Sequence, residues 1–306
     1  LSWAPDNRHL VFSAKSGNED ALIFFDTQKE TRHSHKLGLD GIFTASWSPD
    51  GKYVAFSGLK DGSSDLFLYS IEDKKVTQLT HDLFADMRPS WSPDGSELAF
   101  VSDRGSSLLT GLVNPDSPKA REILKHHDFR TTDIYTININ SGQINRITDT
   151  PGSEDSPSYA NTTSKLAYTS DRTGIWNIYF HDFETGIETP VTDIMTGIFQ
   201  ISWSKDDSRL VFAGYEKGGW DIFTMNNPLG LPQQNIIPTF SNYLKRQNVQ
   251  LDLTYTDSVP VAENRVVNPF ETHVFAYGDQ FAHSTTTTKP EPVVLNTVDS
   301  TGAYQV

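Results

Sequence analysis

The chain has 306 residues and a mass of 34.2 kDa, enough for one large domain or two ordinary ones with a sizeable core. Its formal net charge of -14 and pI of about 5.0 argue against nucleic acid as a partner, because phosphate backbones are repelled by such a surface. The absence of cysteine excludes disulfides, thiolate metal sites and a cysteine nucleophile. No apolar run approaches the roughly 20 residues of a membrane helix, so we expect no direct membrane insertion of this chain.

A repeat of 44 residues organises the chain from its first residue to about residue 230. Each repeat is marked by an aromatic residue that ends a short apolar stretch and opens a turn: Trp3, Trp47, Trp91, Tyr159 and Trp203. The gaps between these markers are 44, 44, 68 and 44 residues. In the sequence WSPDG, proline fixes φ at the first corner and glycine accepts a positive φ at the end, so the segment predicts a tight turn. Because the repeats keep this spacing along most of the chain, we predict one structural unit per repeat.

Four strands are predicted in each unit. Runs rich in β-branched and aromatic residues follow the marker, separated by Asp, Gly, Pro and Ser. The second strands fall at 9–14, 53–58, 97–102, 165–170 and 209–214, the third at 21–26, 65–70, 133–138, 177–182 and 221–226, and fourth strands are readable at 75–80, 143–148 and 187–192. Four-stranded units of about 40 to 50 residues without helical periodicity predict an all-β fold, a β-propeller of four-stranded antiparallel blades.

The spacing also sets the expected boundaries. We expect blades at about 1–39, 40–83, 84–151, 152–195 and 196–230. The 68-residue gap equals one period plus 24 residues, which predicts an insert at 106–132 between the second and third strands of the third blade. Residues 231–306 are rich in Pro and Thr, and we interpret them as a linker that leads into an absent domain. Five repeats that start within a repeat suggest part of a larger propeller.

Alternating strand direction predicts a binding face. Loops that join second to third strands should share one face with the loops between blades, and long loops on rigid scaffolds are where function is added. The candidate residues on this face are Asp86, Arg88, Asp103, Arg104, His126, His127, Asp128, Glu154, Asp155, Asp171 and Arg172. The Ser-Asp-Arg triplets among them have a structural alternative, in which Asp caps a turn and Arg pairs with an acid of the next blade.

Catalytic motifs are absent from the sequence. It contains no G-x-S-x-G elbow and no H-E-x-x-H segment. Two histidine groupings could suggest a metal, His33 with His35 and the run of residues 126–128. The first has no third ligand beside it, and we favour a role without a metal for both. We therefore expect no catalytic residue, no metal and no cofactor in this chain.

The combined pattern resembles the TolB-type propeller repeat. WSPDG at 47–51 and 91–95, the Ser-Asp-Arg-x-Gly pattern at 102–105 and 170–174, Asp-Ile-Tyr at 133–135 and Leu-Thr at 79–80 carry the resemblance, which covers roughly residues 1–229. It implies a non-catalytic platform of a bacterial cell-envelope protein, periplasmic or secreted, that binds a protein or peptide partner.

Other members of this group of folds suggest a second hypothesis. Similar propellers regulate or gate larger hydrolases, including peptidases, so the catalytic domain could lie outside this chain and other domains of the same full-length protein would then be its partners. A third reading, an enzyme resembling oligogalacturonate lyase, would need several histidines converging on a metal, and the nine histidines here share no common place in the repeat.

Overall fold

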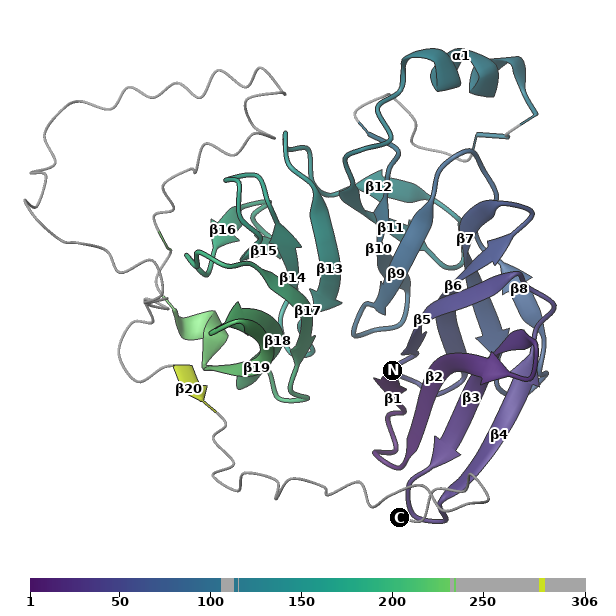
Figure 1. Ribbon diagram of the computed structural model, residues 1–306, viewed down its shortest axis with the longest axis horizontal. Helices are drawn as coiled ribbons and strands as arrows, with labels where there is room; N and C mark the ends of the chain where they lie inside the picture. Colours follow the sequence, from purple (N-terminus) through teal and green to yellow (C-terminus); the bar gives the residue numbers. More distant parts are fainter. Residues whose placement is uncertain (106–112, 115, 232–233, 235–280, 284–306) are drawn as a thin grey trace, which may run out of the picture.

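The computed structural model describes residues 1–105, 113–114, 116–231, 234 and 281–283. Five four-stranded antiparallel sheets follow one another along the chain and form the blades of an all-β propeller (Figure 1). The predicted fold class is confirmed. In all five blades the strands are hydrogen-bonded in simple sequence order.

The strands have the following bounds. The first blade contains β1 (Ser2–Trp3), β2 (His9–Ser16), β3 (Glu19–Asp26) and β4 (Thr31–Lys36), and the second β5 (Gly41–Trp47), β6 (Tyr53–Lys60), β7 (Ser63–Ser70) and β8 (Val76–Gln78). The third contains β9 (Asp86–Trp91), β10 (Glu97–Ser102), β11 (Asp133–Asn138) and β12 (Ile144–Arg146). The fourth contains β13 (Glu154–Tyr159), β14 (Lys165–Ser170), β15 (Asn177–Asp182) and β16 (Glu188–Pro190), and the fifth β17 (Ile198–Trp203), β18 (Arg209–Glu216), β19 (Gly219–Asn226) and β20 (Phe281–His283).

Two of these elements lie in segments without a predicted strand. The fourth strand of the first blade is β4, which carries His33 and His35. The fourth strand of the fifth blade is β20, which pairs with β19 and comes from within the segment 231–306 that the sequence assigned to a linker. Most of that segment, including 284–292, lies outside the described residues. A short 3-10 helix, Pro228–Gly230, follows β19.

The first strand of each blade is the innermost. β5, β9, β13 and β17 each pack on the first strand of the preceding blade and on strands behind it, and no comparable series joins the fourth strands among the described residues. Sheets that fan out from an axis approach each other at their inner edges, so the first strands line the axis (Figure 1).

The WSPDG turns are held by the hydrogen bonds that their composition predicts. In the second blade the Ser48 hydroxyl donates to Asp50 at 2.7 Å and accepts the backbone N–H of Tyr53 at 2.9 Å. Gly51 closes the turn at φ +76°, a conformation that a side chain would strain. The same bonds recur around Ser92 and Ser204, so the turn chemistry is repeated with the blade.

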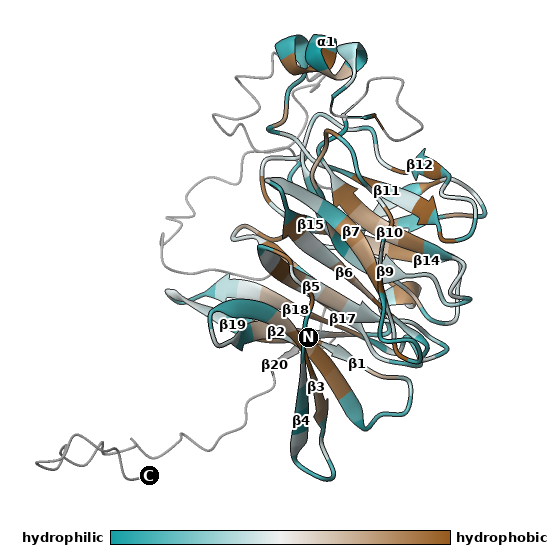
Figure 2. Cartoon of the chain, turned by 90° about the vertical axis from the view of Figure 1, so that its right-hand side faces the viewer, coloured by the Kyte–Doolittle hydropathy of each residue, from teal (hydrophilic) through white to brown (hydrophobic). Residues whose placement is uncertain are grey.

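In the second, third and fifth blades, the tryptophan that precedes the turn packs on the preceding blade. Trp91 is 8% exposed and lies in one cluster with Ala55, Leu66 and Leu68 of the second blade. Its indole N–H donates to the carbonyl of Ser46 at 3.0 Å, and Trp203 makes the equivalent bond to the fourth blade. Figure 2 shows the apolar colour concentrated on the strands rather than on the turns. The core is therefore a series of clusters between blades.

A third and a fourth strand are joined by a polar clasp in three blades. A threonine after the fourth strand accepts a backbone N–H from the third strand at 2.9 Å and donates its hydroxyl to an Asp or Asn at the start of that strand. The pairs are Thr80 with Asp65, Thr148 with Asp133, and Thr192 with Asn177. This clasp explains the Asp-Ile-Tyr and Leu-Thr elements of the repeat, since each buried polar group finds its partner in the other element.

The fourth blade replaces the WSPDG turn with a different support. Its turn follows Tyr159, and Asp207 of the fifth blade accepts hydrogen bonds from the backbone N–H groups of Asn161 and Thr162 at 2.8 and 2.6 Å, and from both their side chains. The missing Pro-Asp-Gly is thus compensated by a neighbouring blade.

The expected insert, residues 106–132, falls between β10 and β11, and its residues 106–112 and 115 lie outside the described residues. It contains α1 (Pro118–His126), capped by Ser117, whose hydroxyl accepts the N–H of Ala120 at 3.1 Å. Ala120 packs with Val113 on Phe84, which is completely buried. In the region that the structure describes, neither this helix nor any other is long and apolar enough to span a bilayer.

Candidate functional site

The innermost strands share an irregularity at the axis. In β5, β9, β13 and β17 the pairing register with the second strand shifts in the middle of the strand, which marks a β-bulge at the same place in four blades. Three of these bulges hold a non-glycine residue in the left-handed region: Arg88 at φ 55°, Ser156 at 53° and Gln200 at 54°. Such bulges re-aim side chains and are enriched beside functional sites.

The bulge residues of neighbouring blades contact one another. Arg88 Nε lies 2.9 Å from Oδ1 of Asp155, which precedes the bulge of the fourth blade. The backbone N–H of Gln200 donates to the hydroxyl of Ser156 at 3.3 Å. In the second blade the position equivalent to Arg88 is Thr44, and Phe43 precedes it as Asp155 precedes Ser156; the Phe43 ring is 49% exposed. We call Phe43, Arg88, Asp155, Ser156 and Gln200 the axial site.

The chemistry of the axial site is mixed. The Arg88 side chain is 40% exposed, whereas Asp155 is more enclosed at 22%. Burial raises the pKa of the Asp155 carboxyl, and the positive charge of Arg88 opposes that rise. An exposed ring, an accessible guanidinium, a carboxylate and a primary amide can together bind an apolar side chain, a carboxylate and the amides of a peptide.

Most other predicted site residues support the loops. The carboxylate of Asp103 accepts the N–H of Ala85 at 2.9 Å, and that of Asp171 accepts the N–H of Ser153 at 2.6 Å. Each bond ties the loop between second and third strands to the loop that enters the same blade. In these two blades the two loops therefore lie side by side.

The arginines of the Ser-Asp-Arg triplets are buried inside their blades. Arg104 pairs with Asp82 and Asp86, and all three side chains are completely enclosed. Its guanidinium lies over the ring of Phe84, 5.3 Å from the centroid. Asp86 belongs to the same blade as the arginine and Asp82 to the loop that enters this blade, so neither acid comes from the next blade; the loop after the second strand folds back over the start of the first strand. Burial raises the pKa of Asp86, and the charge of Arg104 counteracts this effect.

The fourth blade repeats the arrangement with different acids. Arg172 lies 3.5 Å from Glu154 and 2.5 Å from Glu188, and its guanidinium is 4.3 Å from the ring centroid of Tyr179. Glu154 is completely buried, and this burial raises its pKa. Asp86, Arg104 and Glu154 are thus enclosed supports and offer no surface to a partner.

The insert places its residues at three different depths. His126 is exposed, and Asp128 pairs with Arg130 at 2.7 Å on the surface. The Nε2 atom of His127 lies 2.6 Å from the carbonyl of Asp103, and its ring packs on Phe84 and Phe129. The run 126–128 does not converge on one point. On β4, the Nδ1 atom of His35 is 3.0 Å from the hydroxyl of Tyr69, and its ring packs on Phe24.

Three carboxylates gather beside Arg104. Within the described residues, Asp65, Asp82 and Asp86 each place an oxygen within 4.8 Å of the others. Arg104 already binds two of these acids, and Asp65 accepts a hydrogen bond from Gln78 at 3.0 Å. The guanidinium supplies the positive charge that this cluster requires, so we assign no metal to it.

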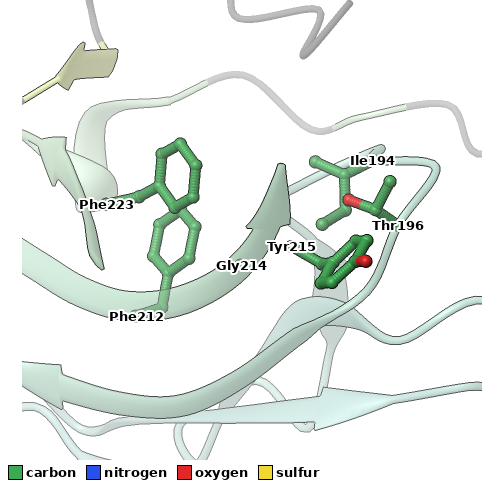
Figure 3. Close-up of a pocket in the computed structure, with 6 residues that line it drawn as sticks. All are labelled: Ile194, Thr196, Phe212, Gly214, Tyr215 and Phe223. Carbon is green, nitrogen blue, oxygen red and sulfur yellow. The ribbon is translucent and has the colours of Figure 1, made fainter. Parts of the chain in front are cut away.

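A small apolar hollow lies on the fifth blade. Figure 3 shows Phe212 and Phe223 stacked beside each other, with Tyr215, Ile194 and Thr196 across the opening. In the third and fourth blades an arginine packs on the corresponding aromatic pair. The fifth blade carries Glu216 in place of this arginine, and the hollow remains where the guanidinium would lie.

Sequence reasoning missed the bulges of the axial site, although one signal was present. Pro89 and Pro157 stand at the same place in two predicted first strands, and proline inside a strand indicates an edge or a bulge. Gln200 carried no comparable signal, because the residue after it is isoleucine.

The fold is a β-propeller, and its repeats resemble TolB-type blades. Residues 1–109 match the family model described as the TolB beta propeller domain, which confirms the resemblance found in the sequence. No curated protein sequence matches the chain.

Solved structures with the same fold include two described as TolB. Putative TolB from Agrobacterium tumefaciens is 20% identical, with a TM-score of 0.60 over 75% of this chain and 77% of that one. TolB from Acinetobacter baumannii is 21% identical, with a TM-score of 0.56 over 74% of this chain and 51% of that one. A puromycin hydrolase is 12% identical, with a TM-score of 0.52. The match includes 74% of this chain but only 35% of that enzyme. These likenesses concern the fold.

Proposed function

We propose that this chain is a non-catalytic platform that binds a protein or peptide segment at the axial site. The observation that carries the proposal is the repeated bulge in four inner strands, which places an exposed ring, the Arg88–Asp155 pair and Gln200 at the inner edges of neighbouring blades. A peptide that lies along the axis would pack on Phe43 and bond to Gln200. The resemblance to TolB supports a periplasmic or secreted position in a bacterial cell envelope.

The residues of the predicted face take part as scaffold. Asp103 and Asp171 hold the loops around the axis in place. The buried ion pairs of Arg104 and Arg172 hold the starts of the inner strands. A rigid site lowers the entropy that binding must overcome. The exposed members of the insert, His126 and Asp128, lie on the same structural unit as α1 and could extend the contact area.

The test compares two charge-matched variants. Arg88→Gln removes the exposed cation of the axial site, and Arg32→Gln removes an exposed arginine from the outer strand β4. Immobilised chains are incubated with an extract of bacterial envelope proteins, and bound proteins are quantified by mass spectrometry. We expect Arg88→Gln to lower capture of the bound protein at least about tenfold, the effect of roughly 1.4 kcal/mol, and Arg32→Gln to leave it unchanged. Equal capture by all three chains would show that the axial site is not the binding site.

A second candidate function is a gating domain of a larger hydrolase. The observation in its favour is that the chain matches about a third of the puromycin hydrolase structure, so the same fold occurs as one part of a larger enzyme. In that case the axis would control entry of substrate to a separate catalytic domain. Expression of this chain joined to its genomic neighbour domain, with and without Arg88→Gln, would reveal a changed preference for peptide length. The same preference for peptide length with and without Arg88→Gln would contradict a gating function.

A further inference from the structure

Arg88 pairs with its acid in a different way from the other paired arginines of the propeller. Its closest approach to Asp155 is through Nε, at 2.9 Å, and within the described residues its two terminal nitrogens make no hydrogen bond. Every other arginine that pairs with an acid in the described part of the chain uses at least one terminal nitrogen: Arg8, Arg104, Arg130, Arg146 and Arg172. Arg88 thus retains the two nitrogens through which a guanidinium can bind a further carboxylate.

The bulge and the ion pair hold Arg88 in place. Its backbone adopts the left-handed conformation, which is unfavourable for a residue with a side chain and which redirects that side chain from the regular course of the strand. Asp155 is held in turn, because its Oδ1 atom accepts the backbone N–H of Ser156. Arg88 is the more exposed partner of the ion pair. A guanidinium that is held through Nε and is accessible to solvent is pre-organised to bind an anion.

Apolar residues accompany this cation on the inner strands. The residue before the bulge is Phe43 in β5, Met87 in β9 and Phe199 in β17. In β13 the same position holds Asp155, the partner of the arginine. The Phe43 ring is about half exposed, and Phe199 is partly exposed beside Trp176, with 5.7 Å between the ring centroids. A ligand at the axial site therefore meets one accessible cation together with apolar side chains.

We infer that the axial site binds the C-terminal end of a peptide chain whose last residue is apolar, with its α-carboxylate on the terminal nitrogens of Arg88. The inference rests on the proposed function and names the part of the partner that the site recognises. A C-terminal residue presents its carboxylate and its side chain from one carbon atom. A single residue therefore satisfies both the guanidinium and the apolar side chains near it. An Asp or Glu within a chain would use its own side chain on Arg88 and would need further ordered residues for the apolar contacts.

The experiment uses a peptide library in two chemical forms. Random peptides of about six residues, a length that a single site can bind, are synthesised once with a free C-terminal carboxylate and once as the C-terminal amide. Each form is passed over the immobilised chain, and the retained peptides are identified and quantified by mass spectrometry. The two forms differ only in the charge at the chain end, so any difference in retention reports recognition of that carboxylate.

Two variants should change retention in opposite directions. We expect the unmodified chain to retain the free-acid form at least about tenfold better than the amide, with Phe, Leu and Met enriched at the last position. Arg88→Gln should abolish this difference, and the control Arg32→Gln on β4 should preserve it. Asp155→Asn should raise retention of the free-acid form about threefold and leave the amide form unchanged, because the bound carboxylate no longer faces a like charge. Circular dichroism checks that every variant keeps its β structure.

The contrary outcomes separate this inference from the proposed function. Equal retention of the two forms that still depends on Arg88 overturns the inference and leaves the proposed function standing. Preferential retention of amides that contain Asp or Glu overturns the assignment to a chain end, because the carboxylate then comes from a side chain. Retention that is unchanged by Arg88→Gln contradicts both. If neither form is retained, the inference fails, and capture from the envelope extract decides the proposed function by itself.

Discussion

Replacement of Trp91 by alanine tests the interface on which the whole propeller depends. The indole is almost completely buried against the second blade, and its N–H bonds to the carbonyl of Ser46. A tryptophan side chain buries on the order of 200 Å², which at about 25 cal/mol per Å² corresponds to about 5 kcal/mol. Measured costs of Trp→Ala substitutions in cores are about 3 to 5 kcal/mol. We expect Trp91→Ala to lie in this range.

The matched control is Trp3→Ala, which removes the same residue from the same place in the repeat. Since about half of the Trp3 side chain is exposed, we expect a loss of at most about 2 kcal/mol. Urea unfolding followed by far-UV circular dichroism, at concentrations where the chain is monomeric, gives both free energies. The urea dependence should be checked for a single transition, because blades can unfold separately. Equal losses in the two variants would refute the assignment of Trp91 as a buried contact between blades.

Four further predictions concern single features of the fold. Burial, with the nearby negative charge of Glu154, raises the pKa of Asp133 to about 7 despite Arg146, so the folded state holds a proton there that the unfolded chain loses near pH 4. The free energy of unfolding should therefore fall between about pH 4 and 7 relative to Asp133→Asn. Deletion of residues 106–132 should cost about 2 kcal/mol in urea unfolding, because it exposes Phe84. Asp207→Ala should cost about 2 to 3 kcal/mol through the lost bonds to the fourth blade. Arg104→Met should cost about 3 to 5 kcal/mol by leaving two buried acids without a counter-charge.

Each of these predictions has a distinct contrary result. Identical pH profiles for the chain and Asp133→Asn would show that this carboxyl titrates normally; asparagine suits the site, since Asn177 forms the same clasp in the fourth blade. A deletion that leaves stability unchanged would mean that the insert does not cover Phe84. Asp207→Asn serves as the control for alanine, because it retains an acceptor for the turn around Asn161. A neutral Arg104→Met would indicate that the acids are protonated in the folded state.

The repeat in the sequence determined the architecture, because it reports local chemistry. Turn formation at WSPDG depends on proline, glycine and side chains within a few residues, and these bonds are found around Ser48 as the composition predicts. Strand alternation likewise placed the loops of Asp103 and Asp171 on one face. The sequence did not predict β4 and β20, because β4 is polar and β20 is short. They form strands because the outer edges of β3 and β19 offer free backbone groups to pair with.

Only the tertiary structure decided which charged residues are accessible. Asp86, Arg104 and Glu154 resemble surface residues in sequence, yet they are enclosed because a loop folds back over the inner strand and the opposite charges meet there. Burial depends on elements that are distant along the chain, so composition alone carries no trace of it. The same holds for Trp3 and Ile222, which are exposed although Trp91 and Leu66, at the same places in the repeat, are buried.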